Sequence, residues 1–292
     1  MSIYKIKVGI IGGSGLENLA NHILKSRTEI LPQDIKSDFG LPSGKIFLGT
    51  ISGVEVALLS RHGPDHKISP TNVNYRANID ALKSIGCTHI LASTACGSLS
   101  ESINRGQLVI PDSFLDRTHS RIGTLFDGTS EKYPGVCHVP MEPAFHPAMI
   151  EVLTQAHKEL GLDVKNGGTI AVIEGPRFSS KAESKALRLL GGDLVNMTTC
   201  PEVCIAKEAG ILYAAIAMAT DYDSWRESDD NVCVTDVMTV FKKNINKVTD
   251  MIVKAVEIIG RRQDWDKDID ELKDLIVSSN CSNFNLHEKT QN

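Results

Sequence analysis

Three short loops of small and polar residues follow apolar, strand-like runs and have the composition of an anion site. The loops are Gly12–Gly15, Ser60–Gly63 and Ser93–Gly97. Glycine lets the backbone approach an anion closely, and hydroxyl and amide groups supply hydrogen-bond donors. Arg61 adds a guanidinium fork that matches phosphate in a bidentate manner. Together the loops predict a pocket for a free, phosphate-sized anion at the ends of strands.

Two carboxylates follow another apolar run almost at once. The run Leu212–Met218 predicts a buried strand, and Asp221 and Asp223 come just after it. Such acids can be helix caps or solvated loop residues. The carboxyl ends of strands are, however, where α/β proteins bind their ligands. Because a carboxylate accepts hydrogen bonds, the ligand predicted here donates them, as an exocyclic amine does.

Two further strand ends carry residues with both a structural and a functional interpretation. Phe178 and Ser179 follow the strand-like run Thr169–Ile173, and Met197 ends another. A phenylalanine beside a Gly-Pro turn commonly fills the core, and so does a methionine. The functional alternative is an aromatic shelf under a flat ring, a small polar neighbour, and a methionine packed on a sugar.

Two other site types fit the sequence poorly. The segment Gly13–Gly15 could open a dinucleotide fingerprint, but Asn18 occupies the position of the third glycine. His62 and His66 have a helical metal-ligand spacing, yet Gly63 and Pro64 break the helix that it requires. The pair Cys200 and Cys204 lacks a second Cys or His pair nearby, so we expect no zinc or other metal.

Composition excludes several classes of protein. The chain has 292 residues, a formal net charge of −5 and only 5% aromatic residues, which disfavours nucleic-acid binding. No apolar run approaches the ~20 residues of a membrane span, and the N-terminus lacks a signal-peptide plan. The seven cysteines are scattered and odd in number. We therefore expect no disulfide framework and a cytoplasmic location, with the nucleus left open.

Strand-like and helix-like stretches alternate with short connections, which predicts an α/β fold. The runs 46–51 and 54–60 flank Ser52-Gly53 and indicate a hairpin, so the twisted sheet should be mixed. Helices are expected over 73–85, 147–160, 181–190, 201–209, 237–259 and 268–277. No linker is evident, so we expect one domain over 1–292, with a core at 5–260 and a C-terminal helix and polar tail at 261–292. The stretch 278–292 is expected to be loosely held unless a partner subunit orders it.

Six motifs in order also resemble a known family. They are Gly-Gly-Ser-Gly-Leu, Ser-Arg-His-Gly, Thr-Ala-Cys-Gly-Ser, Glu-Gly-Pro-Arg-Phe-Ser-Ser, Asn-Met-Thr-Thr and Ala-Thr-Asp-Tyr-Asp-Ser-Trp. This set closely resembles the S-methyl-5'-thioadenosine phosphorylases, within the trimeric purine nucleoside phosphorylase family. The likeness runs from about Lys5 to Gly260. It implies a nucleoside phosphorylase fold and phosphate-dependent cleavage of methylthioadenosine to adenine and 5-methylthioribose 1-phosphate, in methionine and purine salvage.

The resemblance also implies roles for individual residues. The phosphate ligands would be Ser14, Arg61, His62, Thr94, Ala95 and Thr198. The nucleoside contacts would be Phe178, Met197, Asp221, Tyr222 and Asp223. Asp221, Arg61 and His62 would be catalytic, and His138 would reach a neighbouring subunit's site in a homotrimer. Phosphate would be a co-substrate, and no metal or organic cofactor is implied.

Three positions separate the resembled family from its 6-oxopurine relatives, which place Glu, Asn and His where Ser179, Asp221 and Val234 stand here. An ionised Asp221 suits the N6 amine of adenine, whereas a 6-oxo group would leave two acceptors facing each other, at a cost of roughly 1–3 kcal/mol. Val234 offers no partner to a 5'-hydroxyl but suits a methylthio group, whose burial contributes about 1–2 kcal/mol.

The sequence departs from the resembled family at two places, and three alternative functions stay open. Ser14 stands where the animal enzymes usually carry Thr, and the tail around Phe284 does not align with the family's tail. The alternatives are a phosphorylase of inosine, guanosine or adenosine, a non-catalytic nucleoside-binding protein, and, remotely, a dehydrogenase using the first glycine loop.

Overall fold

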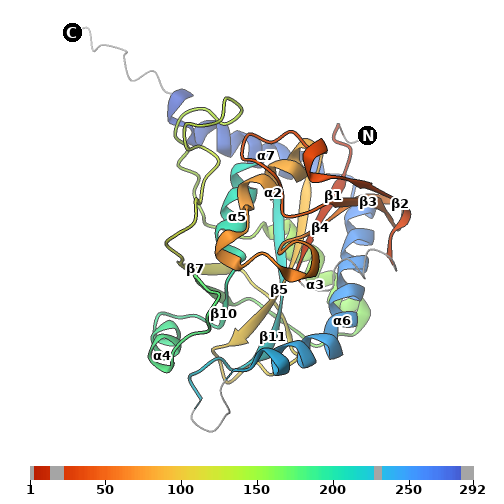
Figure 1. Cartoon of the computed structure of the whole chain (residues 1–292). Coiled ribbons are helices and arrows are strands. Elements are labelled where there is room, and N and C mark those ends of the chain that lie inside the picture. The colour runs from red at the N-terminus through yellow and green to blue at the C-terminus, as the bar shows by residue number, and fades with distance from the viewer. Residues whose placement is uncertain (1–2, 14–22, 227–231, 284–292) are drawn as a thin grey trace, which may run out of the picture.

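A computed structural model describes residues 3–13, 23–226 and 232–283 of the chain. Figure 1 shows a twisted sheet with helices on both sides. The sheet is mixed, so the expected α/β class is confirmed. Its strands β3 (Ile46–Ile51) and β4 (Val54–Ser60) form the predicted hairpin, with Ile51 opposite Val54.

The centre of the sheet consists of parallel strands. β1 (Lys7–Gly12) lies between β4 and β5 (His89–Ser98), and β5 also pairs in parallel with β11 (Leu212–Asp221). The main path continues from β5 through β10 (Leu194–Asn196) and β9 (Thr169–Ile173) to β7 (Ser113–Arg117). The remaining strands are β2 (Lys25–Ile30), β6 (Leu108–Ile110) and β8 (Val164–Asn166).

The central strands are buried on both faces, and their side chains alternate between two cores. Along β5, Ile90 and Ala92 belong to one core, and Leu91 belongs to the other. This alternation follows from the period of two of a β-strand. Helices α2 (Tyr75–Ser84) and α5 (Thr199–Glu208) contribute to the first core. The second is covered by α3 (Pro147–Leu160), α6 (Val234–Arg261) and α7 (Trp265–Ser279).

The expected helices all form, with differences at their ends. Helix α4 (Lys181–Leu189) begins at a capping box between Ser180 and Glu183. Helices α6 and α7 extend beyond the predicted spans. Helix α5 begins two residues before Pro201, although Cys200 inside its first turn has an extended backbone (φ −99°, ψ 136°). None of the described helices is long and apolar enough to cross a membrane.

The beginning of the C-terminal tail is not loosely held, which corrects one expectation. The Asn280 side chain donates a hydrogen bond to the Pro134 carbonyl (2.8 Å), and the Cys281 amide donates to the Val136 carbonyl (2.8 Å). The amide of His138 in turn donates to the Ser279 carbonyl at 2.9 Å. Residues 279–283 are therefore attached to the irregular segment 133–138 of the same chain. The tail position at Phe284 lies outside the described residues.

Candidate active site

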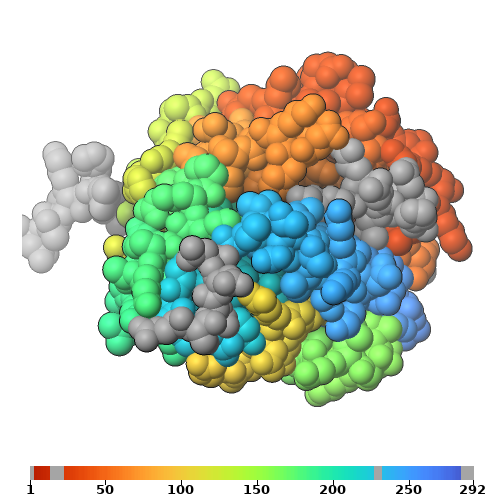
Figure 2. Space-filling view, turned by 60° about the horizontal axis from the view of Figure 1, so that its bottom comes forward, coloured from red at the N-terminus to blue at the C-terminus, as the bar shows by residue number. Residues whose placement is uncertain are grey.

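The strand ends that the sequence singled out meet at one cavity of about 750 Å³. Its walls come from the ends of β1, β4, β5, β9, β10 and β11 and from the first turns of α6. The volume is typical of a small-molecule site. In Figure 2 the blue first half of α6 lies between the green region that includes α4 and an orange region from the first third of the chain. The separate loops of the sequence therefore form a single site.

A glycine in β5 permits this convergence. A Cβ atom at Gly97 would lie 2.9 Å from Asp221 Oδ1 and 3.0 Å from Val195 Cγ1. Real Cβ atoms do not tolerate the first of these contacts, and the second is tight. Any larger residue at position 97 would displace the carboxylate that lines the cavity.

Most of the predicted anion ligands line the cavity. Arg61, His62, Thr94, Ala95 and Thr198 all line it, and Ser14 lies outside the described residues. Ala95 is exposed within an otherwise buried strand because it faces this hollow. Thr198 precedes α5, so the positive end of that helix dipole is also at the cavity.

Arg61 is buried and paired with Glu202, an acidic residue that the sequence analysis missed. Its Nε and Nη2 donate to the two carboxylate oxygens of Glu202 at 2.6 and 2.8 Å, and its Nη1 donates to the Ser93 carbonyl at 3.1 Å. Burial acts to lower the pKa of Arg61, but attraction to Glu202 outweighs it and raises that pKa. A guanidinium has five N–H donors, so two remain available to an anion.

The two acids line the cavity farther along β5, where Asp221 pairs with Gly97, whereas Arg61 contacts the Ser93 carbonyl. The Asp221 carboxylate accepts hydrogen bonds from the Thr220 hydroxyl and from the Asp223 amide, both at 2.8 Å. Burial raises the pKa of Asp221. The two hydrogen bonds act to lower that pKa, but the negative charge of the nearby Asp223 adds to the rise. Asp223 adopts a positive φ of 49°, and its pKa is also raised by burial. Both side chains line the cavity with less than a tenth of their surface exposed.

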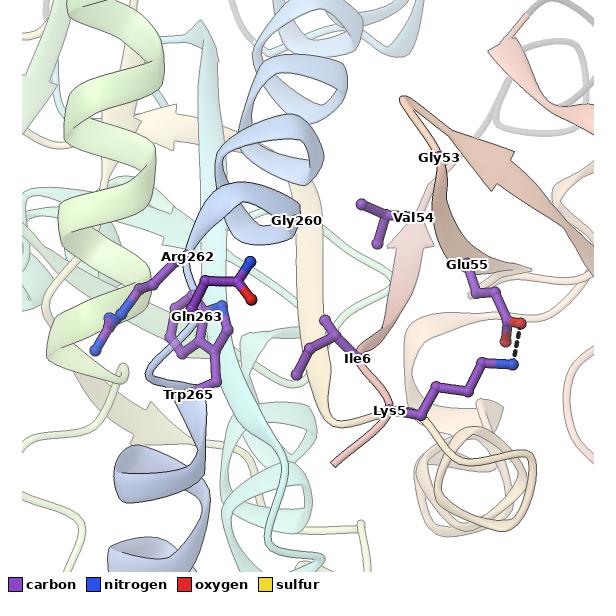
Figure 3. A pocket seen from close by; sticks show the side chains of 9 residues that line it. All are labelled: Lys5, Ile6, Gly53, Val54, Glu55, Gly260, Arg262, Gln263 and Trp265. Atoms are coloured by element: carbon purple, nitrogen blue, oxygen red, sulfur yellow. Dashed lines mark ion pairs between the residues drawn. The ribbon is translucent and has the colours of Figure 1, made fainter. Parts of the chain in front are cut away.

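A second hollow, of about 320 Å³, lies elsewhere on the molecule and lacks such chemistry (Figure 3). Its charged groups are already paired: Lys5 with Glu55, and Arg262 with Asp264. The remainder is mainly apolar, with Val54, Ile6 and the indole of Trp265. Of these two hollows, as the described residues line them, the first combines available donors with buried acids.

Comparison with known proteins decides the family. The model of the phosphorylase superfamily matches residues 7–257. S-methyl-5'-thioadenosine phosphorylase from Aedes aegypti is 56% identical over 275 residues, which are 94% of this chain and 96% of that protein. The chain belongs to the S-methyl-5'-thioadenosine phosphorylase family. The Anopheles gambiae enzyme of the same name is 53% identical over 277 residues, covering 95% of this chain and 97% of its own length.

Solved structures agree with this assignment. Methylthioadenosine phosphorylase from Schistosoma mansoni, solved in complex with adenine, superimposes with a TM-score of 0.89 at 38% identity. The match covers 95% of this chain and all of that one. The dehydrogenase alternative therefore finds no support, and the expected nucleoside phosphorylase fold is confirmed.

The family's nucleoside positions are mostly at the cavity. Phe178, Met197 and Val234 line it, together with Val237 and Phe241 of α6. Gly175 (φ +68°) lies against Met197, because a Cβ there would be 2.5 Å from the methionine sulfur. The backbone of the Glu174–Phe178 loop thus fixes where the methionine can lie.

Tyr222 is not among the residues that line the cavity, and its assignment as a substrate contact stays a prediction. Its hydroxyl donates to Asn104 Oδ1 at 3.3 Å, and the Arg226 guanidinium covers its ring at 3.5 Å. Strand β11 ends at Asp221 and the chain turns at Asp223, and in this turn the Tyr222 ring packs on Arg226 and not in the cavity.

Two other predicted residues stand behind or apart from the cavity wall. Ser179 is buried beside Asp223, and its hydroxyl and that of Ser184 act to lower the pKa of Asp223, although neither makes a hydrogen bond of standard geometry. His138 is exposed and does not line this chain's cavity. Its role toward a neighbouring subunit stays a prediction.

Arg121 is a second residue that the sequence analysis missed. Its guanidinium donates to the Glu174 side chain and carbonyl and to the carbonyls of Met197 and Cys200. It also donates to the Tyr75 hydroxyl. Arg121 therefore joins the loop that carries Phe178 to the turn that carries Met197. Arg121 ends the polar run Asp116–Arg121, and nothing in that run distinguishes Arg121 from its polar neighbours.

Proposed function

We propose that this chain cleaves S-methyl-5'-thioadenosine with inorganic phosphate, giving adenine and 5-methylthio-D-ribose 1-phosphate. The observation that carries the proposal is one cavity with an arginine-based anion site and a separate pair of buried carboxylates. Family membership supports the same reaction, since the named relatives are methylthioadenosine phosphorylases.

The proposed mechanism assigns the anion site to phosphate and the acid pair to the purine. Cleavage of the glycosidic bond builds positive charge on the ribose and negative charge on the leaving purine. Phosphate held by Arg61, His62 and the hydroxyls of Thr94 and Thr198 would stabilise the cation and capture it at C1'. Asp221, with its raised pKa, would share a proton with the departing base.

Specificity for methylthioadenosine follows from two groups of cavity-lining residues, the acids Asp221 and Asp223 and the apolar side chains of α6. Carboxylate acceptors suit the N6 amine and not a 6-oxo group. The apolar side chains of Val234, Val237, Met238 and Phe241 suit a methylthio group and leave a 5'-hydroxyl unpaired. Phosphate is the co-substrate, and we propose no metal or organic cofactor.

We also infer a homotrimer with sites near subunit interfaces. Val234 and Phe178 line the cavity yet are 63% and 36% exposed, and an adjacent subunit carrying an exposed His138 would cover such apolar surface. Light scattering should give the mass of three chains. A cytoplasmic location stays a prediction.

Release of the free base should be measured with methylthioadenosine and adenosine, which give adenine, and with inosine, which gives hypoxanthine, each with and without phosphate. We expect rapid, strictly phosphate-dependent release from methylthioadenosine and a kcat/KM for inosine lower by at least about 100-fold. Equal rates on inosine would favour a 6-oxopurine phosphorylase. Binding without phosphate-dependent release would favour a non-catalytic nucleoside-binding protein.

A further inference from the structure

The ring of His62 is fixed by the loop that follows it. Its Nδ1 lies 2.9 Å from the Ile68 carbonyl oxygen, and the Ile68 amide donates back to the His62 carbonyl at 3.0 Å. A carbonyl oxygen can only accept, so Nδ1 carries the hydrogen. In a neutral imidazole the other nitrogen, Nε2, is then an acceptor.

The surroundings of His62 disfavour a second proton on the ring. The charged and titratable groups that face it are Arg61 on the same turn, His66 on the next turn and Arg121 from the segment after β7. The His66 ring lies against it, with centroids 4.1 Å apart. Burial, Arg61 and the other two groups lower the pKa of His62 to about 3, against the hydrogen bond to Ile68. The ring is therefore neutral in the free protein at pH 7.

The proposed anion site thus offers several donors, and His62 Nε2 is a group there that can accept a hydrogen bond but cannot donate one. The two remaining N–H groups of Arg61 are donors, and the Thr94 and Thr198 hydroxyls can be donors. A neutral His62 instead needs a partner that brings a hydrogen. Hydrogen phosphate carries a P–OH group, whereas sulfate has the same shape and charge but no proton at neutral pH.

We propose that His62 selects the protonated oxyanion: hydrogen phosphate binds by donating its own P–OH to Nε2, whereas sulfate binds only when the ring takes up a proton from water. This inference rests on the proposed function, because it assigns the protonation state of that reaction's co-substrate. The proton lies between phosphate and His62 throughout, so no bond forms or breaks on binding.

The test is calorimetric titration of the full-length protein with sodium phosphate and with sodium sulfate at pH 7.5 and 8.5, in buffers of different ionisation enthalpy. Sulfate should bind with uptake of about one proton, and its affinity should fall by up to tenfold over that pH unit. Phosphate should bind with almost no proton uptake and at least about tenfold more tightly than sulfate at pH 8.5.

Two variants separate this role from a purely structural one. In His62→Gln the amide can rotate to donate, so sulfate should bind without proton uptake and the preference for phosphate should shrink. His66→Gln, a matched change against the same ring, should keep both the preference and the proton uptake. Thermal unfolding of each variant checks that it is folded.

The outcomes of these titrations distinguish the role of His62 from the proposed phosphorolysis of methylthioadenosine. If wild-type protein binds sulfate without proton uptake and as tightly as phosphate, while adenine release still requires phosphate, the role of His62 is refuted and the function stands. If phosphate neither binds nor supports adenine release, the function itself fails.

Discussion

The buried pair of Arg61 and Glu202 fixes the position of the guanidinium at the proposed anion site. Their side chains are 2% and 1% exposed, and the contact is bidentate. Such a pair fixes geometry rather than adding much net stability, but removing one partner leaves a buried charge uncompensated. Tyr213 donates a third hydrogen bond to the Glu202 carboxylate at 2.9 Å. Glu202 is thus a positioning residue for the guanidinium.

Glu202→Gln should therefore weaken phosphate binding more than nucleoside binding. One of the two charge-assisted bonds to Arg61 is lost, so the guanidinium can turn away from the cavity. We expect the KM for phosphate to rise by at least about tenfold and the free energy of unfolding to fall by about 3 kcal/mol. Initial rates at varied concentrations of each substrate, with urea denaturation, measure both.

Tyr213→Phe is the matched control, because it removes a bond to Glu202 and keeps the ion pair. It should shift the KM for phosphate in the same direction by a smaller factor. An equal rise in KM for both substrates in Glu202→Gln would argue against a role specific to the anion site.

Among the elements, the segment between β7 and α3 contains no helix or strand and yet organises the site. The Glu174 carboxylate accepts hydrogen bonds from the backbone amides of His119 and Ser120 and from the Arg121 guanidinium. Burial acts to raise the pKa of Glu174, but these donors outweigh it and lower that pKa to about 2. The carboxylate is therefore ionised and holds the segment against the loop that carries Phe178.

Arg121→Lys should lower kcat/KM for methylthioadenosine by at least about 100-fold. A lysine has one nitrogen and cannot reach Glu174, Met197, Cys200 and Tyr75 together. Both nucleoside-facing loops should lose their fixed separation. Steady-state kinetics and an adenine-binding titration measure this effect.

Ile122→Ala, at an exposed neighbouring position, should leave these values unchanged. Wild-type kinetics in Arg121→Lys would mean that the two loops are held by their own backbone.

The sequence predicted the elements well because their signals are local. Hydrophobic periodicity predicted the helices, and proline or glycine residues indicated where helices begin and where the hairpin turns. Arg121 and Glu202 could not be predicted, since they act on residues 53 and 141 positions away in the chain. The direction of the Tyr222 side chain depends on the turn at Asp223, which follows the end of β11 and which a strand pattern does not predict.

At the scale of the whole molecule, buried histidines link stability to pH. His62 and His89 titrate near pH 6.5 when unfolded, but burial lowers the pKa of each to about 3 in the folded chain. Between these values the unfolded chain binds more protons, so acid favours unfolding. The raised pKa values of Asp221 and Asp223 act in the opposite sense over their own range.

The free energy of unfolding should therefore fall between pH 7 and pH 5. Each of the two rings contributes up to about 2 kcal/mol of this loss. Urea denaturation at several pH values measures it, and His89→Asn should reduce the slope. His138→Asn, at an exposed position, should not. A stability that is constant over this range would contradict neutral burial of the two rings.

We propose that the buried Asp221 selects an aminopurine while phosphate binds at Arg61 in the same cavity. The most direct test is the ratio of kcat/KM for methylthioadenosine to that for 5'-methylthioinosine, which differs only at C6. We predict a ratio of at least about 100 in the wild-type protein and a fall of at least about tenfold in Asp221→Asn. A ratio that stays unchanged in Asp221→Asn would contradict this account.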